Sequence, residues 1–226
     1  MLSRPFASLA VVLAVLSLPA LVGSEAFGQK GDRVKLKGKV KTVSEKQMAI
    51  EEKPETDYLI HISSRTHVSV EGTAVPDYLT HGVDVEVVAD VNKAGVIPTP
   101  LSEITVCTFN EGHPATFAPE DPTKASHKGK DAVNRYVIRG TIKTIRGGKL
   151  TIATPDKLVK ATLAPDAKIK VLVNDVTWAQ VGDEASVQGV EIFAGEVQAQ
   201  TLKVALAKPL EPKKAEGPTR KKTAGR

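Results

Sequence analysis

The chain has 226 residues, of which 41% are hydrophobic and 25% are charged. These values are ordinary for a globular protein and exclude a wholly disordered, collagen-like or polytopic membrane chain. Aromatic residues make up only 4%, so we expect a core of aliphatic side chains. The single cysteine excludes an internal disulfide framework and a cysteine-based zinc site.

The beginning of the chain has the layout of a secretory signal peptide. Arg4 precedes an apolar segment over residues 9–18, and small residues suited to a signal peptidase follow. We predict a signal peptide over residues 1–26, cleaved after Ser24 or Ala26, and a periplasmic or secreted protein. The alternative is an uncleaved membrane anchor, since about 18 apolar residues can cross a bilayer.

The formal net charge of +5 is concentrated at the end of the chain. Residues 208–226 contain seven basic and two acidic side chains, whereas the body before them is neutral. This segment has three prolines and Leu210 as its only large aliphatic residue, so it buries too little apolar surface to offset its ordering entropy. We predict a disordered basic tail over residues 208–226.

An internal repeat organises the body of the chain. Residues 34–43 read VKLKGKVKTV and residues 136–145 read YVIRGTIKTI, so Gly38 aligns with Gly140. The offset changes by only one or two residues over about 75 positions, which indicates a duplicated domain. We predict two copies, over 27–109 and 136–207, joined by a Pro-containing linker over 110–135.

Each copy shows the two-residue period of β-strands. Val34, Leu36 and Val40 alternate with lysines, and the second copy repeats this pattern. Short helical turns are predicted at 77–80 and 175–180. After the opening strand, the expected strands are 46–52, 57–63, 66–71, 83–91, 101–108, 136–146, 149–154, 158–164, 168–173, 184–193 and 196–207.

Five or six short strands, the first with a central glycine, favour a small OB-like barrel for each copy. The fold class is therefore all-β, with two tandem OB-like barrels. Three motifs stand out: GKVKTV at 38–43 with MAI at 48–50, GTI at 140–142 with LTI at 150–152, and VGDEASV at 181–187; the first copy departs from the third motif with HGVD at 81–84. These motifs are similar to those of exported bacterial OB-like domains of unknown function. The resemblance implies a fold and an extracytoplasmic location, and no activity.

The sequence lacks the residue patterns of catalysis. Ser63 and Ser64 follow His61, but they lie at a strand end where serine is common, and no acidic pair is placed to span a cleft. We therefore predict a protein that is not an enzyme and has no cofactor. Cys107 is expected to be a buried thiol, with a thiol that dimerises the protein as the alternative.

Metal binding is a weaker alternative that would use His61, His67 and His81. The first two lie on the solvent side of their predicted strands, and no His-x-His or His-x3-His spacing fixes two of the three on one element.

Binding of an anionic polymer is the functional hypothesis that the charges favour. Alternate lysines of the first strand stand about 6.8 Å apart on its solvent face, although aromatic residues for base stacking are missing there. We predict an exported, non-enzymatic binding or structural module of the bacterial envelope, whose tail contacts anionic polymers or lipid headgroups. A nucleic-acid-binding OB-fold protein is the alternative. The predicted polyanion-binding residues are Lys35, Lys37, Lys39, Lys41, Lys213, Lys214, Arg220, Lys221 and Lys222.

Overall fold

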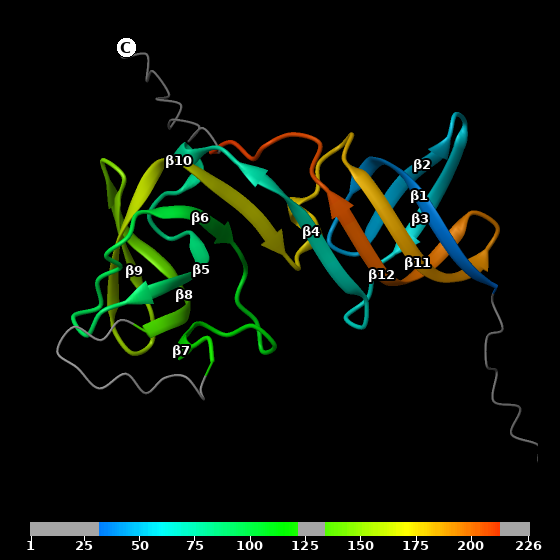
Figure 1. Ribbon diagram of the computed structural model, residues 1–226. Helices are drawn as coiled ribbons and strands as arrows, with labels where there is room; N and C mark the ends of the chain where they lie inside the picture. Colours follow the sequence, from blue (N-terminus) through cyan, green and yellow to red (C-terminus); the bar gives the residue numbers. More distant parts are fainter. Residues whose placement is uncertain (1–31, 122–133, 213–226) are drawn as a thin grey trace, which may run out of the picture. The chain divides into compact units, whose positions relative to one another are not determined.

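The computed structural model describes residues 32–121 and 134–212 as strands joined by turns (Figure 1). Single-turn 3-10 helices η1 (Pro76–Tyr78) and η2 (Val176–Trp178) form where helical turns are predicted. The all-β class is confirmed, while the predicted signal peptide lies outside the described residues. The strands are β1 (Arg33–Val43), β2 (Gln47–Lys53), β3 (Thr56–His61), β4 (His67–Ala74), β5 (Asp84–Val91), β6 (Leu101–Val106), β7 (Thr116–Pro119), β8 (Asn134–Arg146), β9 (Lys149–Ala153), β10 (Leu158–Val173), β11 (Glu184–Phe193) and β12 (Glu196–Ala205).

Five strands close into a barrel that we call the β1 barrel. β1 pairs with β2 and β11, β2 pairs with β3, β3 pairs with β12, and β12 returns to β11. The β3–β12 pairing is parallel, with Val197 opposite Ile60, and the others are antiparallel. A closed five-strand barrel of this kind is compatible with an OB-like barrel.

A second ring of five strands, the β8 barrel, closes in an equivalent way. β8 pairs with β5 and β9, β9 pairs with β10, β10 pairs with β6, and β6 returns to β5. Here the parallel pairing is between β10 and β6, with Leu163 opposite Leu101. In both rings, the third strand of one copy therefore pairs in parallel with the last strand of the other.

Each barrel takes strands from both halves of the chain. The β1 barrel combines β1, β2 and β3 with the late strands β11 and β12, and the β8 barrel combines β5 and β6 with β8, β9 and β10. We expected residues 27–109 and residues 136–207 each to close a barrel alone. The strands instead pair across the two copies. Because both copies have the same alternation of apolar and polar residues, that pattern identifies strands but does not select between equivalent partners.

Equivalent hydrogen bonds connect the two halves. The Gly82 N–H donates to the Ile142 carbonyl at 2.9 Å, and the Gly182 N–H donates to the Val40 carbonyl at 2.8 Å. Gly82 aligns with Gly182 and Val40 aligns with Ile142, so each glycine binds the first strand of the opposite copy. The same contact is thus made twice.

β4 and the second half of β10 pair antiparallel with each other. Val70 lies opposite Val173, and Gly72 lies opposite Val171. Two separate strands were expected over 158–164 and 168–173, but β10 is continuous. The first half of β10 therefore pairs with β9, while its second half lies between β6 of the β8 barrel and β4.

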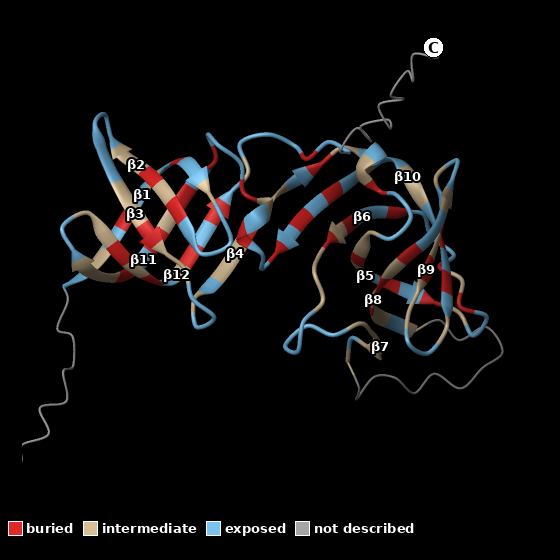
Figure 2. Ribbon diagram, turned by 180° about the vertical axis from the view of Figure 1, so that it is seen from behind, coloured by how far each residue is buried: buried red, intermediate tan, exposed pale blue. Residues whose placement is uncertain are grey.

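Aliphatic side chains fill the interior, as the composition predicts. Met48 and Ile50 in the β1 barrel and Ile138 and Ile152 in the β8 barrel are wholly buried. Figure 2 shows buried residues alternating with intermediate ones along β2, β8 and β9. Burial of each such side chain contributes about 1.5–3 kcal/mol, so both barrels are held mainly by apolar packing.

Gly38 and Gly140 permit the close approach that bends each first strand. A Cβ atom at Gly38 would lie 2.4 Å from the Glu51 carbonyl oxygen, and one at Gly140 would lie 2.3 Å from that of Ala153. Just beyond each glycine, the pairing with the next strand contains a register shift. The central glycine of each first strand therefore permits the bend in both copies.

Part of the predicted linker over 110–135 is a strand. β7 pairs with β8, and the Phe117 ring stacks on Tyr136 with 4.3 Å between ring centroids. The Lys157 ammonium lies 3.9 Å from the Phe117 ring centroid. These contacts attach β7 to the outside edge of the β8 barrel despite its lack of strand-like alternation.

The predicted tail over 208–226 includes a residue that is packed against the folded part of the chain. Leu210 is buried, its N–H donates to the Thr73 carbonyl at 2.8 Å, and its carbonyl accepts from Val75 at 3.0 Å. The chain is therefore packed against the end of β4 at this point. Residues 213–226, which contain the five predicted polyanion-binding residues of the tail, lie outside the described residues.

Candidate functional site

Three of the predicted binding lysines form a row on the outer face of β1. Lys35, Lys37 and Lys39 are exposed, whereas Leu36 and Val40 are buried in the interior. Among the described residues, no carboxylate lies within 4.0 Å of these three ammonium groups. Their charges are therefore available to a ligand.

Lys41 differs from the other lysines of the predicted stripe. The β1–β2 register shifts between Val40 and Thr42, and the Lys41 ammonium lies 2.9 Å from Glu51 and 3.8 Å from Asp57. The hydrogen bond to Glu51 is the main cause of a raised Lys41 pKa, with a smaller contribution from the charge of Asp57. Lys41 is thus already paired within the protein.

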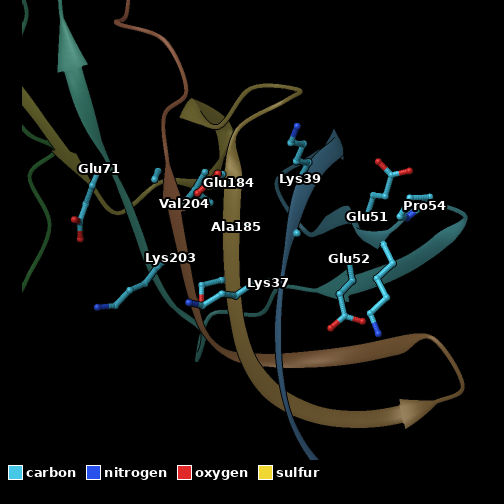
Figure 3. A pocket seen from close by; sticks show the side chains of 14 residues that line it. Lys37, Lys39, Glu51, Glu52, Pro54, Glu71, Glu184, Ala185, Lys203 and Val204 are labelled. Carbon is cyan, nitrogen blue, oxygen red and sulfur yellow. The ribbon is translucent and has the colours of Figure 1, made fainter.

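An open groove of about 750 Å³ lies on the outer surface of the β1 barrel, beside Gly38 (Figure 3). Strands β1, β2, β4, β11 and β12 contribute to its lining. Lysines and glutamates occur there in equal numbers, so the groove as a whole is not basic. Its charged residues are Lys37, Lys39, Lys53, Lys203, Glu51, Glu52, Glu71 and Glu184.

Strand register separates these charges locally. Lys37 lies opposite Ser186, and Ser186 lies opposite Lys203. This cross-strand row of Lys37, Ser186 and Lys203 places two ammonium groups around one hydroxyl. Such a combination of donors suits an anionic group. In the next row, Lys39 lies opposite Glu184, so an anion is attracted to one row and repelled by part of its neighbour.

Lys53, Ser186 and Lys203 were not recognised as site residues from the sequence. Lys53 lies at the end of β2, while Ser186 and Lys203 belong to the other half of the chain and reach β1 only because β11 and β12 complete its barrel. The repeat alignment does not indicate that each barrel takes strands from both copies.

No aromatic side chain of the described residues lines the groove. Tyr58 packs against the core, and the Trp178 ring centroid lies 6.1 Å from that of Tyr78. Base stacking on an OB-like barrel requires exposed aromatic rings over a basic surface. The β1 groove is basic only in part, and no aromatic ring of the described residues lines it.

The histidines of the weaker metal-binding alternative do not form a cluster. His61 Nε2 lies 2.9 Å from Glu196 Oε2, which engages this histidine in a pair between β3 and β12. Within residues 32–121 and 134–212, no three His, Cys, Asp or Glu side chains are placed to hold a metal ion.

A smaller cavity of about 330 Å³ lies on the equivalent outer face of the β8 barrel. Arg139, which aligns with Lys37, is ion-paired with Glu86 there, and Thr141 donates a 2.6 Å hydrogen bond to Asp84. Cys107 also lines this cavity and is half-buried without a disulfide bond. Burial, followed by the charges of Glu86 and Asp84, raises its pKa to about 12.

The fold and the groove define a class: an all-β, barrel-containing protein with an open, mixed-charge groove on the outside of one barrel. Comparisons with protein-family models, with curated protein sequences and with solved structures found no match. The part of the chain that the structure describes contains no helix with the length and apolarity needed to span a membrane.

Proposed function

We propose that this protein is an exported, non-enzymatic binding module of the bacterial envelope that holds an anionic ligand in the β1 groove. The observation that carries the proposal is the row of Lys37, Ser186 and Lys203, whose two ammonium groups have no carboxylate within 4.0 Å among the described residues. Lys35 and Lys39 extend the positive charge along β1. The ligand is an anionic polymer or segment.

The mixed charge of the groove limits how the ligand binds. Each lysine near the surface contributes about 1 kcal/mol at low salt, and salt screens such exposed interactions over about 10 Å. Glu184 and Glu71 oppose part of this attraction. The groove is therefore suited to weak, reversible binding of an anionic chain.

Export and the basic tail remain parts of this proposal. The apolar segment before residue 27 supports secretion, and the basic residues after 212 add positive charge for anionic polymers or lipid headgroups. The alternative of nucleic-acid binding has less support, because the groove has no aromatic lining.

Binding measurements with three defined probes test the proposal. The chain from residue 27 onward is titrated with polyglutamate, with a single-stranded oligothymidine, and with vesicles containing phosphatidylglycerol, each at 20 and 150 mM salt. We expect polyglutamate to bind at low salt and the combined Lys37→Ala and Lys203→Ala change to weaken it about tenfold, since 1.4 kcal/mol corresponds to that factor.

The matched control changes Lys143 and Lys160 to alanine, because both are exposed lysines outside the groove. Equal losses in the two double variants would overturn the assignment of the groove. Binding to oligothymidine that is tighter than binding to polyglutamate would favour the nucleic-acid alternative. Retained vesicle binding in both variants would assign lipid contact to residues 213–226.

A further inference from the structure

Among the described residues, one edge of β1 has no partner strand along its first half. β1 pairs with β11 from Arg33 to Lys39, but it pairs with β2 only from Lys39 onward. Among the described residues, no strand pairs with the opposite edge from Arg33 to Lys37. Such an edge presents unpaired N–H and C=O groups that can receive another strand.

The equivalent edge of the other barrel is occupied by the chain itself. β7 pairs antiparallel with β8, placing Thr116 opposite Arg139 and Phe117 opposite Ile138. These two residues of β8 align with Lys37 and Leu36 of β1. The molecule therefore contains its own example of a short strand bound at this position of the barrel.

Hydrogen-bond directions show which groups of β1 face the open edge. The Asp32 carbonyl accepts from Glu191 on the β11 side, and the Val40 N–H donates to Asp183 on the same side. Because backbone groups alternate along a strand, the N–H and C=O groups of Lys35 and Lys37 face away from β11. On β8, Arg135 has the equivalent parity, and its carbonyl accepts from Glu120, next to β7.

We propose that the open edge of β1 binds an extended acidic peptide of a partner protein as an added antiparallel strand. This inference goes beyond the proposed function, because the open edge faces away from β11 and shares only Lys37 with the groove. By analogy with β7, the peptide places one apolar side chain opposite Leu36 and acidic side chains opposite Lys35 and Lys37. Backbone hydrogen bonds supply the register, and the alternating side chains supply selectivity.

Charge favours an acidic peptide over a second copy of this chain. If two β1 edges paired with each other, exposed lysines of both strands would lie together, and like charges in neighbouring strands are destabilising. Glutamates at the same positions reverse the sign of that interaction. The apolar position has its precedent in Phe117, which is partly buried against the core opposite Ile138.

The test uses a capped heptapeptide in which two glutamates flank one phenylalanine and threonines occupy the ends. NMR of the labelled chain from residue 27 onward measures binding and amide hydrogen exchange. We expect exchange at Lys35 and Lys37 to slow at least tenfold when the peptide is saturating, with little change at Leu36, whose N–H faces β11. An identical peptide carrying backbone N-methyl groups on its β1-facing edge is expected to lose this protection.

Charge variants provide the second arm. The combined Lys35→Glu and Lys37→Glu change is expected to weaken the heptapeptide at least tenfold, whereas Lys143→Glu with Lys160→Glu leaves it unchanged. Peptide binding that depends on Lys35 and Lys37 but gives no amide protection overturns strand addition and leaves the anionic groove standing. Absence of binding by both the heptapeptide and polyglutamate overturns both proposals, and a dimer that forms through this edge without peptide overturns the choice of partner.

Discussion

The β1 barrel and the β8 barrel have equivalent strands but different outer surfaces. Gly38 and Gly140 make the same close backbone contact, and the same parallel pairing closes each ring. On the outside, however, Lys37 lies in an open groove, whereas its counterpart Arg139 is ion-paired with Glu86 next to a bound strand. The comparison teaches that two barrels can share an interior pattern while their outer surfaces differ.

The difference has a simple physical basis. Interior positions are restricted by close packing, because added or lost volume costs free energy directly. An exposed lysine can become an ion-paired arginine with little effect on stability, since surface pairs contribute about 0–1 kcal/mol. Among the described residues, Lys37 has no ion pair, whereas the aligned Arg139 is paired with Glu86, and we therefore place the proposed function on the β1 barrel.

The strongest test of the comparison is to separate the two halves of the chain. A protease site is inserted after residue 127, and the fragments 27–127 and 128–226 are purified apart. Neither fragment contains all five strands of either barrel, so we expect neither to unfold cooperatively in urea. Mixed at equal concentration, they are expected to reassemble and regain the circular dichroism of the uncut chain.

The uncut chain carrying the same inserted site is the control for this experiment. Two fragments that each show a cooperative transition and a native β-sheet spectrum would contradict the exchanged pairing. They would instead support the sequence-based expectation of one barrel per copy.

The second prediction concerns the paired glycines. Gly38→Ala and Gly140→Ala are each expected to lower the free energy of unfolding by about 2–3 kcal/mol or more, because the new Cβ would collide with backbone atoms. Gly112→Ala is the control, since its Cβ would meet only Asn110 at 3.5 Å. Urea denaturation measures all three, and a change at either paired glycine as mild as the control would break the equivalence of the barrels.

The sequence predicted the elements of this fold better than their assembly. The two-residue period located the strands, and the aligned Gly38 and Gly140 identified the bend in each first strand. The exchange was not predictable, because either copy offers the same apolar face to β1. Local alternation describes one strand at a time, whereas partner choice depends on the packing of the whole chain.

The candidate site was predictable only in part for the same reason. Exposed Lys35, Lys37 and Lys39 follow directly from alternation on β1. Lys203 reaches the groove through strand exchange, and Lys41 is paired because of a register shift that one sequence does not reveal. β7 was missed because four residues are too few to show a period.

The smallest expected effect on stability comes from Cys107. Its counterpart in the β1 barrel is Ala205, because Cys107 bonds to Asp84 as Ala205 pairs with Glu184. Ala205 is exposed in the β1 groove. The Cys107 pKa is raised from 9.0 to about 12, so folding favours its neutral thiol. This contribution to stability is complete below pH 9 and is lost as pH rises towards 12. We expect the free energy of unfolding of the natural chain to fall, relative to Cys107→Ala, by about 0.5 kcal/mol at pH 9.5 after allowance for solvent screening.

A thiol moved to the open groove supplies the matched comparison. In the Cys107→Ala background, Ala205→Cys places the thiol in water, where its pKa is expected to be near 8.5 and its effect on stability independent of pH. Alkylation at pH 8 is then expected to be roughly a hundredfold faster than for Cys107, because the thiolate is the reactive form. Equal rates or equal pH profiles would mean that the outer face of the β8 barrel is as open as that of the β1 barrel, and the contrast between the two surfaces would fail.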